Sequence, residues 1–207
     1  MAEQILTQKE LIVELANYAC APDYDNIRFK EKIKQKLLNN VALLYALHDV
    51  NKESELFENG NINYDGDWSL YFGDNIRPYL FIPESQSESK NFLCYDVSFS
   101  ETPKYNGIDK YCNVVFTVLC NNKDAIDKNT GIPRHDLIGG ILCRHFNWSN
   151  IFGNQCKLVK DQGSVTDTNF ITRTLIFEFT TTNSITHTVN NLSLIHISEP
   201  TRRTPIS

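Results

Sequence analysis

The sequence predicts an α+β fold: a mostly antiparallel sheet with a long β-hairpin and one packed helix, preceded by an N-terminal helical extension. Three patterns support this fold class. Apolar residues recur at helical spacing before residue 50, and from residue 68 onward they alternate with polar residues as in strands. The pair Asn106-Gly107 then separates two long alternating runs, which is typical of a hairpin turn.

The first helix is predicted to begin at Thr7. Thr7 and Glu10 have the spacing of a capping box, in which their side chains bind backbone amides that the first helical turn leaves unpaired. Leu11 and Leu15 follow at helical spacing, and Pro22 ends the element.

Two more helices are predicted before residue 50. The longer runs from Asp25 to Leu38, because apolar residues recur there every four positions. These apolar residues are Phe29, Ile33 and Leu37. Asn40 can cap a short helix from Val41 to Leu47.

At Trp68 the pattern changes to a period of two. Trp68, Leu70 and Phe72 alternate with polar or aromatic neighbours, which predicts a strand. A second extended run covers residues 76–82. Pro78 within it indicates an edge position, because proline cannot donate a hydrogen bond to a neighbouring strand.

A long hairpin is the clearest structural signal of the chain. Apolar residues occupy alternate positions in residues 93–99 and again in residues 112–120. Tyr105, Asn106 and Gly107 form its tip, where Asn-Gly supplies the two positive φ angles of a type I′ turn. This tip could contact a neighbouring subunit, or the hairpin could be an ordinary sheet edge without a partner. Both interpretations stay open from the sequence.

A helix is predicted from Pro133 to Phe146, with Pro133 in the first turn, where its missing N–H costs nothing. Gly139 and Gly140 lie within its apolar stripe and cost about 1 kcal/mol each relative to alanine. We therefore expect another backbone to approach closely there. A short strand around residues 156–158 and a strong strand over residues 171–179 complete the domain.

Composition points to a soluble, intracellular protein of ordinary hydrophobic content, 41%. No apolar run approaches the roughly 18 residues that a membrane span requires, and the start of the chain lacks the basic and apolar regions of a signal peptide. The six cysteines include no Cys-x-x-Cys pair. We expect buried free thiols rather than a disulfide framework or a zinc site.

The last residues of the chain differ from the rest. Leu192 through Arg202 match one reading frame of a sequencing-library transposase adapter, as at a contig end in an assembled environmental genome. Without two basic residues and one acidic residue of this tail, the net charge changes from −5 to −6. We expect a helical extension with an acidic loop in residues 1–67, an α+β domain in 68–190, and a non-native tail in 191–207 that replaces a genuine C-terminal segment.

The second predicted helix carries a row of cations. Residues 26–40 contain one acid, Glu31, whereas residues 49–74 are strongly acidic. The cations are Arg28, Lys30, Lys32, Lys34 and Lys36. A solvated face balanced by its acidic neighbour is the preferred interpretation. The alternative is a packaging or accessory protein that binds nucleic acid through this face.

The residues offer no recognisable catalytic constellation. Residues 61–66 imitate the first half of a calcium loop, but Phe72 occupies the position that requires a glutamate, so a turn is predicted. His135, Cys143 and His145 share one helix but not one face, so no metal site is expected. A polar turn before that helix explains the acids Asp124 and Asp127. We predict a protein that is not an enzyme, with no catalytic residues, no metal and no cofactor.

The order of elements from Ile76 to Thr181 resembles the tail-terminator and head–tail joining proteins of long-tailed bacteriophages. The best anchors are residues 131–137, which introduce the long helix, residues 151–153 after it, and the final strand at 173–179. The resemblance is one of element order rather than of a catalytic motif. The N-terminal helical block departs from it, because a minimal member of these proteins is shorter.

The resemblance implies a structural virion protein that forms a ring, commonly a hexamer, at the head–tail junction. Its partners would be further copies of itself and the tail-tube and neck proteins, with DNA passing through the channel without specific binding and with no membrane involved. It would reside in the host cytoplasm during assembly and then in the virion. A net acidic subunit suits such a channel, because lysine–phosphate contacts would retain the DNA.

Overall fold

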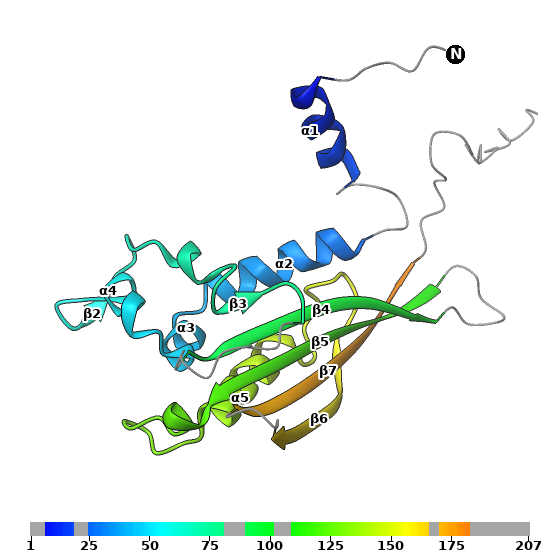
Figure 1. Ribbon diagram of the computed structural model, residues 1–207. Coiled ribbons are helices and arrows are strands. Elements are labelled where there is room, and N and C mark those ends of the chain that lie inside the picture. Colours follow the sequence, from blue (N-terminus) through cyan, green and yellow to red (C-terminus); the bar gives the residue numbers. More distant parts are fainter. Residues whose placement is uncertain (1–6, 19–24, 81–89, 102–108, 166–169, 183–207) are drawn as a thin grey trace, which may run out of the picture.

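The computed structural model describes residues 7–18, 25–80, 90–101, 109–165 and 170–182. Most helical elements come first in the chain, and a sheet follows in which one long helix connects strands β5 (Asp109–Asn121) and β6 (Lys157–Val165) (Figure 1). The elements are α1 (Gln8–Asn17), α2 (Asn26–Leu38), α3 (Val41–Leu47), η2 (Val50–Lys52), α4 (Glu53–Leu56), β1 (Phe57–Glu58), β2 (Asn61–Ile62), η3 (Trp68–Tyr71), β3 (Ile76–Arg77), β4 (Phe92–Glu101), β5 (Asp109–Asn121), η4 (Asn122–Asp124), α5 (Arg134–Phe146), β6 (Lys157–Val165) and β7 (Phe170–Thr182).

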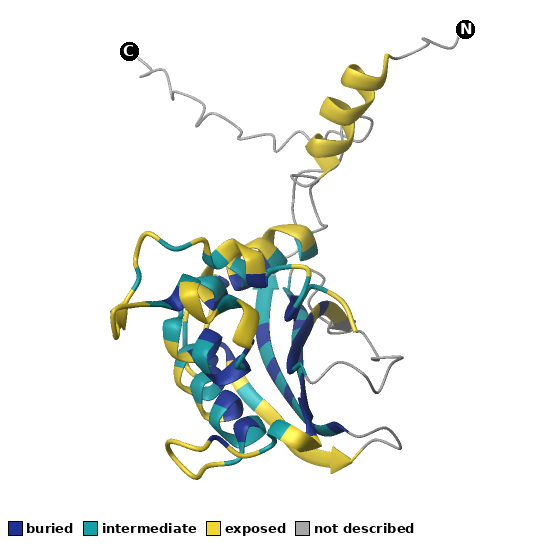
Figure 2. Cartoon of the chain, turned by 60° about the vertical axis from the view of Figure 1, so that its left-hand side comes forward, coloured by how far each residue is buried: buried dark blue, intermediate teal, exposed yellow. Residues whose placement is uncertain are grey.

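Helix α1 begins with the predicted capping box. The Thr7 side chain accepts a hydrogen bond from the Glu10 amide, and the Glu10 carboxylate accepts one from the Thr7 amide at 2.8 Å. The Thr7 hydroxyl holds the pKa of the Glu10 carboxyl below its usual value. No residue of α1 is buried, and the helix projects from the body of the molecule (Figure 2).

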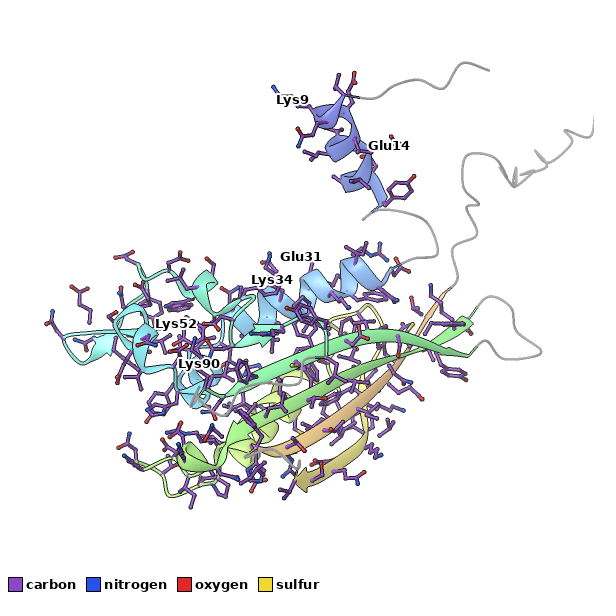
Figure 3. All side chains as sticks on the ribbon, in the orientation of Figure 1. Lys9, Glu14, Glu31, Lys34, Lys52 and Lys90 are labelled. Atoms are coloured by element: carbon purple, nitrogen blue, oxygen red, sulfur yellow. The ribbon has the colours of Figure 1, made fainter. Side chains whose placement is uncertain are left out.

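Helices α2 and α3 also form as predicted. Helix α2 turns its apolar stripe toward the sheet and buries Phe29, Ile33 and Leu37. The charged side chains of Glu31 and Lys34 point away from the sheet (Figure 3). The Asn40 side chain caps α3 by accepting a hydrogen bond from the Leu43 amide at 3.1 Å.

The main sheet has five strands in the order β3-β4-β5-β7-β6. All neighbouring pairs are antiparallel except β3 and β4, which confirms the predicted α+β class with a mostly antiparallel sheet. The predicted hairpin is present as β4 and β5, in which Leu93 lies opposite Val118 and Val97 lies opposite Val114. Strand β3, which precedes Pro78, is an edge strand as expected.

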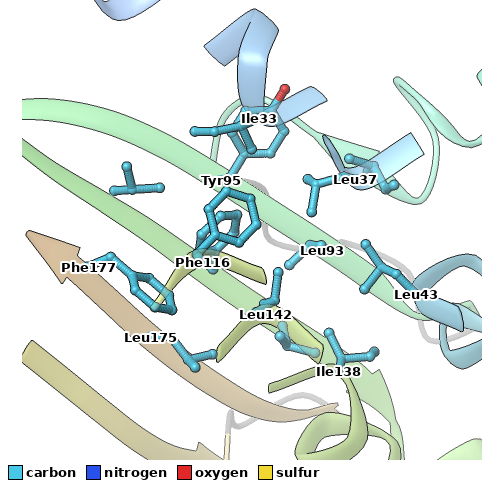
Figure 4. Packing of buried hydrophobic residues seen from close by; sticks show 14 of the residues in the cluster. Ile33, Leu37, Leu43, Leu93, Tyr95, Phe116, Ile138, Leu142, Leu175 and Phe177 are labelled. Atoms are coloured by element: carbon cyan, nitrogen blue, oxygen red, sulfur yellow. The ribbon is translucent and has the colours of Figure 1, made fainter. Parts of the chain in front are cut away.

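The core lies between one face of the sheet and helices α2, α3 and α5 (Figure 4). Alternate residues of the strands point into it, and Phe116 at its centre lies 4.8 Å from Phe146 and 5.7 Å from Phe177 between ring centroids. Ile33 of α2 and Leu43 of α3 belong to the same buried cluster. The N-terminal helices after α1 therefore share a single core with the sheet.

The other face of the sheet carries a smaller cluster. Its buried members are Phe92, Cys94, Leu119 and Phe170. The helices that pack on β4, β5 and β7 do so through the first face, and none of the described helices covers this second one (Figure 2). We call this second surface the open face of the sheet.

Two predicted strands take other forms. Trp68 to Tyr71 forms the 3-10 helix η3 instead of a strand, because Asp67 caps the turn by accepting a hydrogen bond from the Ser69 amide at 3.1 Å. The Trp68 indole donates to the Glu55 carbonyl at 3.0 Å and holds the segment against α4. The run predicted for residues 76–82 pairs only at Ile76 and Arg77 within the described part of the chain.

The final helix and strands differ from the sequence-based prediction in three details. Pro133 is the N-cap of α5 rather than part of its first turn. The close approach of a backbone predicted at both helical glycines is wrong. A Cβ at Gly139 would lie 3.0 Å from the Arg173 side chain, and one at Gly140 would meet nothing within 4 Å. Strand β6 is longer than the three residues predicted, because it pairs along β7 as far as Val165.

The cysteines of the described residues are free thiols, as predicted. Cys94, Cys112, Cys120 and Cys156 are buried, and Cys143 is half-buried. Burial raises the pKa of Cys120 and of Cys156 to about 12. Cys20 lies outside the described residues. Within the described ranges, no helix has the length and apolar character needed to cross a membrane.

Candidate assembly surfaces

The β4–β5 hairpin is the first candidate surface. Its pairing continues to Glu101 opposite Tyr111, with an irregularity between Phe99 and Glu101. The predicted contact residues Tyr105, Asn106 and Gly107 lie outside the described residues. Phe99, close to this end, is 49% exposed, which is unusual for a phenylalanine in a sheet.

Strand β6 is the second candidate surface. It is the last strand on its side of the sheet and pairs only with β7 in the described part of the chain. All of its residues except the half-buried Leu158 are exposed, including Val159 and Val165. The register shifts between Leu158 and Lys160, which places a bulge in this edge. Bulges and lysines restrict indiscriminate strand pairing at an open edge.

The basic residues of α2 are largely engaged within the chain. Lys30 Nζ lies 2.6 Å from an Asp96 carboxylate oxygen, and Lys32 Nζ donates to the Ile151 carbonyl at 3.2 Å. Arg28 pairs with Asp25 at 2.5 Å, and Lys34 pairs with Glu31 at 3.5 Å. Lys36 is the fifth cation of the row predicted on α2. These contacts favour the solvated, internally balanced face over the nucleic-acid interpretation.

A buried network fixes the start of α5. Arg134 is 2% exposed and lies 3.2 Å from carboxylate oxygens of both Asp124 and Asp127. The Thr130 hydroxyl donates to Asp127 at 2.7 Å and lowers the pKa of that carboxyl. The sequence indicated the acidic turn, but it did not reveal Arg134 as the partner. The one available signal was an arginine in the first turn of a helix, where an acid is favoured.

A polar pocket of about 620 Å³ lies beside this network. His48 Nδ1 in its wall lies 2.7 Å from Asp124 Oδ2, and Asn91 donates to the same oxygen at 3.0 Å. Lys90 also lines this wall; it lies close to Lys52 (Figure 3), and Lys52 and Lys90 pair with Asp74 at 2.5 Å and 2.9 Å. The bonds of His48 and Asn91 to Asp124 hold the end of α3, the residue before β4 and η4 together.

The remaining candidates of the sequence do not converge on a site. Asn61 and Ile62 form β2, and a turn follows at Tyr64 and Asp65, as predicted. His135 Nε2 lies 3.4 Å from its neighbour Asp136. Over residues 7–18, 25–80, 90–101, 109–165 and 170–182, no three His, Cys, Asp or Glu side chains gather in a way that could hold a metal ion.

Comparison with protein-family models gives one match, to the model named YomW over residues 39–179, which is about two thirds of the chain. The chain belongs to the YomW family. This is a phage-derived Bacillus protein family, so the expected phage-related origin is confirmed. Comparison with curated proteins gave no match.

The stretch that matches the YomW family model contains the candidate assembly surfaces. The stretch of residues 39–179 begins directly after α2, which ends at Leu38, and includes β4, β5, α5 and β6. The two candidate surfaces, the β4–β5 hairpin and strand β6, therefore lie in the part of the chain that the YomW model matches. Helices α1 and α2 precede it.

Proposed function

We propose that this YomW family protein is a structural virion protein of a tailed phage that forms a ring at the head–tail junction, as a tail terminator or head–tail connector. The phage-derived family supports the setting. The order of a long hairpin, a packed helix and two returning strands supports the type of protein. It works by assembly, with no chemical step.

One observation carries the proposal: the chain presents two unlike bare surfaces toward opposite sides of one sheet. The hairpin end with Phe99 belongs to β4, near one side of the sheet, and the exposed strand β6 is the outermost strand of the other side. A ring is built from contacts between two different patches, whereas a two-fold dimer uses the same patch twice. Unlike surfaces on opposite sides suit the ring.

The proposed partners follow from this role. Further copies of the chain make the ring, for example as a hexamer. Tail-tube and neck proteins bind the two faces of this ring. DNA passes through the channel without specific binding. The net charge of −5 of the chain supports this, because an acidic subunit retains phosphates less than a basic one does. The protein acts in the host cytoplasm during assembly and in the virion afterwards.

A pair of substitutions tests the proposal in the full chain. Phe99→Asp places a charge at the exposed hairpin end, and Leu70→Asp places one at a residue of similar exposure, 47%, on η3. In native mass spectrometry, the wild type and Leu70→Asp should form the same ring, and Phe99→Asp should stay monomeric. Circular dichroism melting checks that Phe99→Asp is folded. A wild type that is monomeric at high concentration, or a folded Phe99→Asp that assembles normally, overturns the proposal.

A further inference from the structure

Helix α1 has an apolar face that the described body does not cover. Leu11, Ile12 and Leu15 project from one side of the helix and are 46%, 57% and 57% exposed. Lys9 and Glu14 border this face on opposite sides (Figure 3), as their positions around a helix of 3.6 residues per turn require. The helix is therefore amphipathic, with a cation along one border and an anion along the other.

This helix needs a partner surface to be stable. It has ten residues, and isolated helices shorter than about 12–15 residues are marginal in water. The capping box at Thr7 and Glu10 fixes where the helix starts but buries no apolar area. Stability in such a helix comes from packing of its apolar face, so Leu11, Ile12 and Leu15 indicate a docking contact.

The open face of the sheet presents a matching surface. Val115 of β5 lies opposite Ile176 of β7, and both are half-buried. Asp96 of β4 continues this row on one side, and Lys160 of β6 continues it on the other, both exposed. Beside the row, a hollow of about 170 Å³ is lined by Leu80, Cys94, Tyr95, Asp96, Val115 and Thr117.

The dimensions and charges of the two surfaces agree. Asp96 and Lys160 lie three strand spacings apart, about 14 Å at roughly 4.8 Å per spacing. A helix with its side chains is about 10–12 Å wide, so α1 fits between them with its apolar face on Val115 and Ile176. In one of the two directions along the strands, Glu14 faces Lys160, and Lys9 lies on the side of Asp96, whose exposed carboxylate also pairs with Lys30 of its own chain at 2.6 Å. The charges thus select the direction of the helix.

We propose that α1 docks on the open face of the sheet in a neighbouring copy of the chain. The position of α2 favours a neighbour over the same chain, because helix α2, which follows α1, lies on the covered face of its own sheet. Asp25 at the start of α2 pairs with Lys110 at 3.6 Å, on that same covered side. The contact rests on the proposed ring, in which each subunit meets its neighbour through unlike surfaces.

Disulfide trapping between two variants of the full chain tests this contact. Chains with Leu15→Cys are mixed with chains with Thr117→Cys and oxidised, and the matched control replaces Leu15→Cys by Val13→Cys on the polar side of α1. A crosslinked dimer is expected with Leu15→Cys and only background with Val13→Cys. A chain with both Leu15→Cys and Thr117→Cys that closes an internal disulfide as a monomer, or equal dimer yields from the two mixtures, overturns the proposal.

Charge reversal gives a second readout that does not require new cysteines. Glu14→Lys and Lys160→Glu should each weaken the assembly seen by native mass spectrometry, and the double variant should restore it. Unchanged assembly in both single variants counts against α1 docking. If the wild type forms rings and these variants form them equally well, only the docking of α1 fails. If the wild type forms no assembly at all, the proposed ring fails as well.

Discussion

At the scale of single residues, Arg134 shows how a buried charge joins distant parts of the chain. It neutralises Asp124 and Asp127 before α5, and its guanidinium also donates to the Ala46 carbonyl at the end of α3. The composition of the turn was visible in the sequence. Arg134, the partner of this turn, was not visible, because a buried ion pair depends on which elements meet in the core. The periodicity of the sequence does not indicate which elements meet.

Replacing Arg134 by methionine should destabilise the protein by about 3–5 kcal/mol, because the buried carboxylate of Asp127 and the half-buried one of Asp124 lose their cation. Urea unfolding followed by circular dichroism measures this loss. Arg144→Met, in the exposed last turn of the same helix, should change the stability by less than about 0.5 kcal/mol. Equal effects of the two substitutions would show that the network does not hold α5.

Thr130→Val should make the protein less resistant to acid. The pKa of Asp127 is depressed in the folded state, chiefly by the Thr130 hydroxyl, so its stabilisation is present above the ordinary pKa of 3.8 and is lost as the pH falls through the folded pKa. Without the hydroxyl, the folded pKa rises, and the midpoint of acid unfolding should move to higher pH. Thr130→Ser keeps a hydroxyl and should retain the wild-type midpoint. A midpoint that is unchanged in Thr130→Val contradicts this assignment.

At the scale of elements, local chemistry predicts some parts of the fold well and others poorly. The capping box at Thr7, the cap at Asn40 and the β4–β5 hairpin were visible in the sequence because each depends on residues close in the chain. The segment from Trp68 to Tyr71 was misread. Alternating apolar residues fit a strand, but the Asp67 cap and the indole bond to Glu55 favour a 3-10 helix.

The two glycines of α5 should respond differently to alanine. Gly140→Ala should stabilise the protein by up to about 1 kcal/mol, because alanine favours the helix and the site is open. Gly139→Ala should gain less or lose stability, because its Cβ would displace Arg173 from Asp136 and Asp161. Thermal unfolding of both variants measures the difference. An equal gain in both would mean that Arg173 moves aside without cost.

At the scale of the whole molecule, the sequence predicted the fold class and the hairpin, with its tip as one candidate contact, but it did not indicate the exposed strand β6 or the open face. The shared core of α2, α3 and the sheet depends on contacts between distant segments, and so does the exposure of β6 and of the open face within the described residues. Phage-related origin agrees with the YomW match. The proposed ring would be an assembly of unlike surfaces, and no single residue of the sequence indicates such surfaces.

Negative-stain electron microscopy of the wild-type full chain over a range of concentrations tests the central claim most directly. Unlike contact surfaces on opposite sides of the sheet predict closed rings with one uniform number of subunits. Monomers at every concentration, or two-fold dimers as the largest particles, would contradict the account.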